Sequence, residues 1–126
     1  MHHIYKSEYI NDNQYGFTPK KSTIDAAMAV KEFLEPELAK RKVAIMVSLD
    51  VKGAFNAAWW PAILKGLRDA ECPRNLYQLT QDYFRKRRAI LLFNGSILEK
   101  TITKGCPQGS CCGPGYWNIQ YNSLLT

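Results

Sequence analysis

The sequence predicts an α/β protein of the α+β type, in which a short antiparallel sheet packs with helices. Three observations predict this class. Several stretches repeat apolar residues at helical spacing. The dipeptide Asn94-Gly95 lies between two β-rich runs, which is the pattern of a two-residue hairpin turn. An apolar run over residues 43–49 is too short for a helix and indicates a buried strand.

The first predicted helix covers about residues 23–40, with Ser22 or Thr23 as its N-cap. Pro36 lies inside this pattern. Because proline has no backbone N–H and its ring clashes with the preceding turn, we expect a kink or break near Glu35. The apolar residues near helical spacing are Ile24, Ala27, Met28, Val30, Leu34 and Leu38.

Two further helices are predicted between the apolar run and the hairpin. One begins around residues 59–61, where a proline suits the first helical turn, and ends by Pro73. The next helix covers about residues 76–87. The residues on one side of this helix are Leu76, Leu79 and Tyr83.

The hairpin is expected to pair residues 89–93 with residues 96–103 across its turn. A last helix is predicted over residues 114–125. Its candidate buried residues are Tyr116, Ile119 and Leu124. The sequence contains no internal repeat or linker, so we expect residues 1–126 to form one unit.

The composition indicates a globular chain with a basic excess. A hydrophobic share of 46% over 126 residues is enough for one core. The 17 Lys and Arg against 11 Asp and Glu give a formal net charge of +6, which favours polyanionic partners. No apolar run approaches the roughly 18 residues of a membrane span, and the N-terminus shows no signal-peptide segment. We therefore expect an intracellular protein, nuclear or cytoplasmic, with no membrane partner.

The four cysteines are Cys72, Cys106, Cys111 and Cys112. They include no C-x-x-C pair, and the two histidines lie together near the N-terminus, so the spacing does not indicate a zinc site. We expect reduced, partly buried thiols with no disulfide partner.

Asp50 follows the apolar run directly, so its carboxylate is expected at the rim of the sheet. Magnesium is usually bound by one or two carboxylates together with substrate phosphates, which favours a metal site here. The alternative is a carboxylate that caps the next helical turn. Gly53 and Ala54 are small enough for backbone N–H groups to approach a triphosphate, and Phe55 could form one side of a sugar pocket.

A second polar element consists of Gln108, Gly109 and Ser110, in a loop that opens the last helix. Such a loop can turn the Gln108 amide towards a base or sugar while its backbone faces phosphate. Together with Asp50, this element predicts a metal-and-triphosphate site.

Two basic runs precede the predicted strands. One covers residues 40–42, and the other leads into the hairpin. Phosphate binding and a solvated charged face are equally compatible with these runs. The second run consists of Arg85, Lys86, Arg87 and Arg88.

Three segments carry a resemblance to a known family. Residues 13–26 read Asn-Gln-Tyr-Gly-Phe-Thr-Pro-Lys-Lys-Ser-Thr-Ile-Asp-Ala, and residues 43–56 contain Ser-Leu-Asp-Val-Lys-Gly-Ala-Phe-Asn. Residues 105–118 contain Pro-Gln-Gly-Ser followed by Cys-Cys-Gly-Pro-Gly. In this order they resemble the fingers-side, first palm and Pro-Gln-Gly-Ser motifs of reverse transcriptases from non-LTR (LINE-type) retrotransposons, in an arthropod-type branch. The resemblance implies part of the fingers and palm of a right-hand polymerase.

The resemblance also implies a role for each matching residue of the first palm motif. Asp50 would be a catalytic ligand of Mg²⁺, and the carbonyl of Val51 would join it on the same ion. The amides of Gly53 and Ala54 would hold the incoming triphosphate. Phe55 would disfavour a ribose 2′-hydroxyl.

In the other two motifs the resemblance implies contacts with nucleotide and nucleic acid. Gln108 would line the nucleotide pocket, while Gly109 and Ser110 would shape the turn beneath it. Lys20 or Lys21 would reach a phosphate or the template.

The implied function is RNA-directed DNA polymerisation, in which a dNTP is joined to the 3′-hydroxyl of a DNA primer on an RNA template. The family's Ala-Asp-Asp motif is not found in the sequence, so we expect the isolated chain to be inactive. Without its usual partner hairpin, residues 43–49 should leave an unpaired edge and exposed apolar surface, and hence marginal stability. Two alternatives stay open: a non-catalytic nucleic-acid-binding remnant, and a decayed element without a function.

Overall fold

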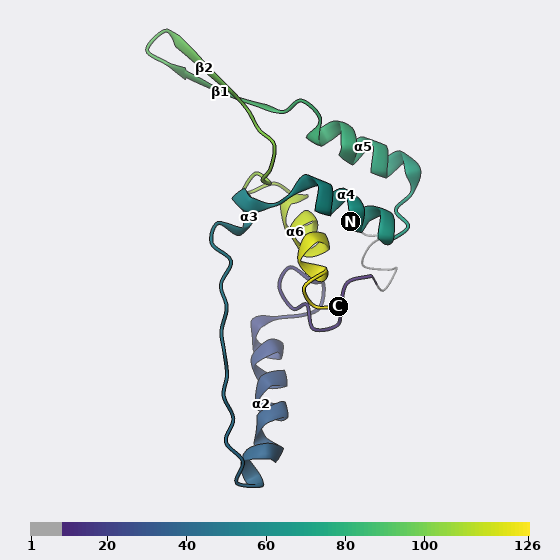
Figure 1. Cartoon of the computed structure of the whole chain (residues 1–126), viewed down its shortest axis with the longest axis vertical. Coiled ribbons are helices and arrows are strands. Elements are labelled where there is room, and N and C mark those ends of the chain that lie inside the picture. The colour runs from purple at the N-terminus through teal and green to yellow at the C-terminus, as the bar shows by residue number, and fades with distance from the viewer. Residues whose placement is uncertain (1–8) are drawn as a thin grey trace.

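The structure is a computed structural model that describes residues 9–126. In this part of the chain, helices accompany a two-stranded antiparallel sheet, which confirms the predicted α+β class. Figure 1 shows α4, α5 and α6 gathered at the middle of the molecule, while α2 and the β1–β2 hairpin extend from it towards opposite ends. The elements are α2 (Thr23–Ala39), α3 (Ala54–Ala57), α4 (Trp60–Asp69), α5 (Arg74–Phe84), β1 (Arg88–Phe93), β2 (Ser96–Thr101) and α6 (Gly113–Asn122).

The hydrophobic core lies where α4 packs against α5 and α6. Gly66 permits the close approach of α4 to α6, because a Cβ atom at this position would lie 2.5 Å from Cγ2 of Ile119. The ring of Trp60 stacks on Phe84 at 5.0 Å between centroids, and Phe84 packs on Tyr116 at 5.2 Å. The buried core residues are Ala58, Trp60, Ile63, Leu67, Phe84, Cys106, Tyr116 and Ile119.

The segment before α2 is attached to α6 by amide side chains. Asn122 is buried, accepts a hydrogen bond from the backbone N–H of Asn11 at 2.7 Å, and donates one to the carbonyl of Tyr9 at 2.9 Å. The Asn11 side chain in turn donates to the carbonyl of Leu125 at 3.0 Å. These bonds fix the start of the described chain against the end of the last helix.

Helix α2 begins with a capping box, as the predicted N-cap implied. The Ser22 hydroxyl accepts a hydrogen bond from the Asp25 N–H at 3.2 Å, and the Ser22 N–H donates to the Asp25 carboxylate at 2.7 Å. The predicted break near Glu35 is wrong, because the helix continues through Pro36 to Ala39. The φ angle of proline suits a helix, and the lost N–H of Pro36 and the clash of its ring do not end α2. No residue of α2 is buried.

The prediction of a buried strand over residues 43–49 is also wrong. These residues form an extended segment with no strand assignment, which Figure 1 shows between the far end of α2 and α3. Val43 is 90% exposed, Ile45 87% and Leu49 88%. A strand is held by hydrogen bonds to a neighbouring strand, and within residues 9–126 the paired strands are β1 and β2 alone. The predicted exposure of apolar surface is therefore confirmed.

The hairpin forms where the Asn-Gly signal predicted it. Strand β1 pairs antiparallel with β2, in a register that places Phe93 opposite Ser96. Asn94 has a φ of 52° and Gly95 a φ of 79°, which is the left-handed pair of a type I′ turn. Every residue of both strands is exposed. The sheet therefore projects from the helices, and the expectation that it packs with them is wrong.

The structure shows which residues of two predicted helices are buried. In α5 they are Thr80 and Phe84, whereas the residues predicted to share one side, Leu76, Leu79 and Tyr83, are exposed. In α6, Tyr116 and Ile119 are buried as predicted. The prediction of a buried Leu124 is wrong, since this residue is 72% exposed beyond the end of the helix at Asn122.

The described cysteines are all free thiols. Cys106 is buried, Cys72 is half-buried, and Cys111 and Cys112 are exposed. Among the helices of residues 9–126, none combines the length and the apolar character that crossing a bilayer requires.

Candidate functional site

A pocket of about 410 Å³ brings together residues from three distant segments. Phe55 comes from α3, and Gln108, Gly109 and Ser110 come from the turn before α6. Phe17 reaches the pocket from the loop before α2. The volume lies within the range of roughly 300–1,000 Å³ that is usual for small-ligand sites. Four of the predicted nucleotide-binding residues therefore meet in one pocket.

The chain on either side of the pocket is joined by backbone hydrogen bonds. The Gly105 N–H donates to the carbonyl of Ala58 at 2.7 Å, and the Cys106 N–H donates to the carbonyl of Phe55 at 2.8 Å. The indole N–H of Trp60 donates to the carbonyl of Gly105 at 2.9 Å. Gly105 has a φ of 97°, which a residue with a side chain rarely adopts. These bonds fix the Pro-Gln-Gly-Ser turn to the segment that carries Phe55.

Ser110 shapes the entry into α6. Its hydroxyl oxygen accepts a hydrogen bond from the N–H of Gly113 at 3.0 Å, and its own N–H donates to the carbonyl of Pro107 at 3.3 Å. A Cβ atom on Gly113 would lie 2.8 Å from the Ser110 Oγ and 3.4 Å from Cε1 of Phe55. Gly113 is thus a positioning residue to which the sequence analysis gave no role, although it belongs to the quoted motif.

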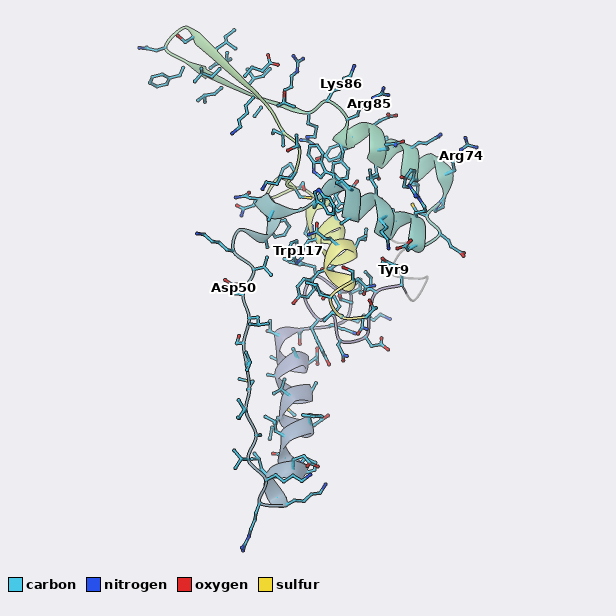
Figure 2. All side chains as sticks on the ribbon, in the orientation of Figure 1. Tyr9, Asp50, Arg74, Arg85, Lys86 and Trp117 are labelled. Atoms are coloured by element: carbon cyan, nitrogen blue, oxygen red, sulfur yellow. The ribbon has the colours of Figure 1, made fainter. Side chains whose placement is uncertain are left out.

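The residues before Phe55 do not line the pocket. Gly53 is the N-cap of α3, with a φ of 61°, and its carbonyl accepts a hydrogen bond from the Ala57 N–H at 2.8 Å. Ala54 is the first residue of this four-residue helix. Asp50 and Val51 are exposed on the extended segment, and Figure 2 shows Asp50 apart from Trp117 and α6. The structure therefore separates the predicted metal ligands from the predicted nucleotide pocket.

The described residues do not form a complete metal site. Within residues 9–126, no three His, Cys, Asp or Glu side chains cluster as metal ligands. Asp50 thus offers one exposed carboxylate, together with the carbonyl of Val51. Two-metal phosphoryl transfer needs several carboxylates around a pair of ions. The donor set of residues 9–126 does not fit such a pair.

Aromatic rings extend from the pocket along α6. Phe17 meets Phe55 edge-on at 5.9 Å between centroids, and Phe55 lies 6.3 Å from Trp117. Trp117 stacks on Tyr121 at 5.7 Å. Phe17 and Trp117 received no role in the sequence analysis. The only signal for Phe17 was its place in the fingers-side motif.

Two residues of the basic run over residues 85–88 contact other side chains. The guanidinium of Arg87 lies 4.3 Å from the ring centroid of Tyr83. Arg88 forms an ion pair with Glu99 on the facing strand, with 2.6 Å between Nη1 and Oε1. These contacts hold both side chains along the root of the hairpin.

The other basic candidates differ in their surroundings. Arg85 and Lys86 are exposed at the junction of α5 and β1, where Figure 2 labels them. Lys21 forms an ion pair with Asp12 at 4.0 Å. Lys20 is exposed in the adjacent turn. Lys20 and Lys21 are more than 60 residues away in sequence from Arg85 and Lys86, so the two pairs are separate candidates.

Burial raises the pKa of two side chains next to the site. Burial raises the pKa of the Cys106 thiol, so this residue stays protonated and acts as a core residue. Burial also raises the pKa of the Tyr116 hydroxyl, while its hydrogen bond with Thr80 at 3.3 Å opposes that shift. Both groups stabilise the core behind the turn in their neutral forms.

Comparisons with known proteins identify the family of this chain. The family described as reverse transcriptase (RNA-dependent DNA polymerase) matches residues 1–126. A Retrovirus-related Pol polyprotein from type-1 retrotransposable element R1 of Bradysia coprophila is 34% identical over 116 residues, which are 92% of this chain and 11% of the relative.

Two further relatives are similar over most of the chain. A putative 115 kDa protein in type-1 retrotransposable element R1DM of Drosophila melanogaster is 36% identical over 112 residues, or 89% of this chain and 11% of the relative. An RNA-directed DNA polymerase from mobile element jockey of Drosophila funebris is 30% identical over 107 residues, or 84% of this chain and 12% of the relative.

The chain therefore spans only about 11–12% of the length of these relatives. No solved structure matches it significantly. The family match covers the whole chain, and the relatives are retrotransposon proteins that include RNA-directed DNA polymerases. The chain belongs to the reverse transcriptase family of non-LTR retrotransposons.

Proposed function

We propose that the chain forms the nucleotide-facing part of an RNA-directed DNA polymerase. The pocket between Phe55 and the Gln108–Ser110 turn would receive the incoming deoxynucleoside triphosphate. One observation carries this proposal: α3 and the turn before α6 meet at one small pocket, although they are far apart in the sequence. Two bonds between backbone atoms hold them there, so the pocket is preorganised by the fold.

Two residues of the pocket and two residues just before Phe55 have chemical roles in this proposal. The Phe55 ring would exclude a ribose 2′-hydroxyl by its bulk. The Gln108 amide can both donate and accept hydrogen bonds, which suits the edge of a base or the sugar. The backbone N–H groups of Gly53 and Ala54 would face the triphosphate once the extended segment lies closer to the pocket.

The family implies a divalent metal, with Asp50 and the Val51 carbonyl as its ligands here. Magnesium in such enzymes neutralises the charge on the transferring phosphate. Because the described residues supply one carboxylate at this place, we propose that the isolated chain binds nucleotide but has no polymerase activity. Its own share of the reaction is to bind and orient the nucleotide.

Nucleotide binding tests the proposed pocket. We expect Gln108→Ala to weaken dGTP binding to the purified chain by about tenfold in isothermal titration calorimetry, the scale of one lost hydrogen bond with its desolvation. Gln78→Ala is the matched control, because Gln78 is exposed on α5 and lines no part of the pocket. Equal affinity of both variants and the parent chain would exclude this pocket as the nucleotide site.

Primer extension tests the proposed inactivity. We expect no product when the chain is mixed with an RNA template, a DNA primer, dNTPs and Mg²⁺. Extension that is lost in Asp50→Ala would contradict the proposal, because it would mean that this carboxylate acts in a complete site. Extension that persists in Asp50→Ala would indicate a contaminating polymerase.

We also propose that Arg85 and Lys86 bind the phosphate backbone of the template or primer. The observation that favours them is that both are exposed, whereas Arg87 and Arg88 already contact Tyr83 and Glu99. Lys20 is a weaker candidate, and Lys21 would have to leave its ion pair with Asp12.

Salt dependence tests this second proposal. Arg85→Ala should weaken binding of a labelled RNA and reduce the slope of log affinity against log salt by about one. Arg74→Ala is the matched control, since Figure 2 shows Arg74 at the other end of α5. An Arg85→Ala variant with an unchanged slope would remove this residue from the interface.

A further inference from the structure

Gln14 and Asn118 form a buried amide pair that joins the loop before α2 to α6. Gln14 is 6% exposed and Asn118 is 0% exposed. The Gln14 side-chain NH₂ donates to Oδ1 of Asn118 at 3.1 Å and to the carbonyl of Gly16 at 3.1 Å. The Asn118 side-chain NH₂ donates to the carbonyl of Gly16 at 3.0 Å and to that of Phe17 at 3.2 Å. We call this pair the amide lock.

The amide lock has one arrangement only. Each NH₂ group faces two oxygen acceptors, so a rotation of either amide would place oxygen against oxygen. No buried side-chain nitrogen or oxygen in the described residues lacks a partner. A satisfied buried polar pair of this kind fixes one packing arrangement, because any shift of the loop would leave polar groups unpaired in the core.

The residue that the amide lock holds is Phe17. Its φ is 54°, in the left-handed region that is uncommon for a bulky side chain. Such strained conformations persist where the surroundings hold them, and they cluster at functional sites. Phe17 as a whole is 58% exposed, yet it lines the pocket and its ring meets Phe55 edge-on at 5.9 Å. Burial of its own ring therefore does not explain the strain.

We infer that Phe17 is a second aromatic wall of the pocket, that it contacts the base or sugar of the bound nucleotide, and that Gln14 and Asn118 are positioning residues for it. The inference rests on the proposed nucleotide role of the pocket. Every base has an apolar face, so an aromatic ring at this place binds nucleotides without selecting one base. The fingers-side motif thereby becomes part of the nucleotide site.

Calorimetry on the 126-residue chain tests the contact, with dGTP and inorganic tripolyphosphate as separate probes. Phe17→Gly should weaken dGTP binding by about tenfold, the scale of one base–aromatic contact. The affinity for tripolyphosphate should not change, because this probe has no base or sugar for the Phe17 ring to contact. Phe33→Ala is the matched control, an exposed phenylalanine on α2 that lies outside the pocket, and should bind both probes like the parent chain.

Thermal stability separates this role from a structural one. Phe17→Gly should melt at a higher temperature than Phe17→Ala, because glycine adopts a positive φ without strain whereas alanine retains it. Both variants should lose dGTP affinity. If Phe17 only supports the fold, the less stable of the two variants should also show the larger loss of dGTP affinity.

A double-mutant cycle tests the amide lock. Gln14→Leu keeps the bulk of the side chain, removes its NH₂ group, and should weaken dGTP binding in the parent chain. In the Phe17→Gly background the same change should have no further effect on dGTP affinity, because the ring that Gln14 positions is gone. Additive effects would overturn the inference. If Gln14→Leu fails to fold, the Phe17→Gly and Phe17→Ala variants still decide whether the Phe17 ring contacts the nucleotide. Neither of them changes a side chain of the amide lock.

The two proposals fail in different ways. dGTP binding that Gln108→Ala weakens and Phe17→Gly leaves unchanged would overturn the inference about Phe17 alone. An absence of dGTP binding that depends on Gln108 would overturn the proposed pocket, and the inference with it.

Discussion

Helix α6 and the segment over residues 43–49 both carry large apolar side chains, but only α6 is buried. Ile119 on α6 lies inside the core, while Val43 and Ile45 on the extended segment are almost fully exposed. The two regions differ in their packing neighbours. Helix α6 packs against α4, whereas the extended segment has no neighbouring strand in the described chain. Apolar sequence predicts a tendency to be buried, and contact with a second element determines whether burial occurs.

The same contrast divides the candidate site. The Pro-Gln-Gly-Ser turn is attached by backbone hydrogen bonds to the segment that carries Phe55, so its geometry is fixed. Asp50 belongs to the extended segment and is exposed. The proposed nucleotide pocket is therefore organised by the chain's own packing, whereas the position of the carboxylate is not. Four predictions test this contrast.

The largest effect is expected in the core. Ile63 is fully buried on α4, and Ile63→Ala should lower the free energy of unfolding by about 2–5 kcal/mol through lost burial and a residual cavity. Ile45→Ala, the same substitution on the extended segment, should change it by less than about 0.5 kcal/mol. Urea denaturation followed by tryptophan fluorescence measures both. Comparable losses would mean that the extended segment is packed in solution.

A smaller effect is expected at the amides that attach the start of the described chain to α6. Asn122→Ala should cost about 1–3 kcal/mol, because the N–H of Asn11 and the carbonyl of Tyr9 each lose a partner. Asn13→Ala is the matched control, since Asn13 is exposed in the same segment. The same denaturation measurement applies. An Asn122→Ala variant as stable as Asn13→Ala would show that this attachment contributes nothing.

The hairpin should respond locally. Gly95→Ala places a side chain at a φ of 79°, which should destabilise the turn by about 1–2 kcal/mol. Because both strands are exposed, the core should not be affected. Amide hydrogen exchange should become faster in β1 and β2 and stay unchanged in α4 and α6. Faster exchange throughout the molecule would show that the hairpin is coupled to the core.

The smallest perturbation is chemical labelling of the cysteines. Burial raises the pKa of Cys106, so less thiolate is present at a given pH and iodoacetamide should modify it more slowly than the exposed Cys111 and Cys112. The rate at Cys106 should rise with pH through a higher range than that of a free thiol. Peptide mass spectrometry measures each site, and urea should equalise them. Rapid labelling of Cys106 in the folded chain would mean that the turn opens.

Local signals allowed much of the fold to be predicted from the sequence. The capping residue Ser22, the proline at the start of α4 and the Asn94-Gly95 turn act within a few residues, and each marks the element that the structure contains. The errors concern contacts between elements. The buried position of Leu124 and the strand over residues 43–49 both depended on a neighbour that sequence periodicity does not identify.

The candidate site divides in the same way. Gln108, Gly109, Ser110 and Phe55 could be selected from their motifs, because residue type and order suffice to recognise them. The amide lock between Gln14 and Asn118 could not, since nothing in either segment identifies a hydrogen-bond partner 104 positions away.

The sequence by itself determined the family, the order of the four longer helices and the hairpin, and the residue types of the proposed nucleotide pocket. The tertiary structure alone decided that the pocket forms without Asp50, that Phe17 is held in a strained conformation beside Phe55, and that residues 43–49 stay exposed. The physical reason is that capping, turn and motif signals act between near neighbours in the chain. Burial and buried hydrogen bonds form between segments that only the folded chain brings together.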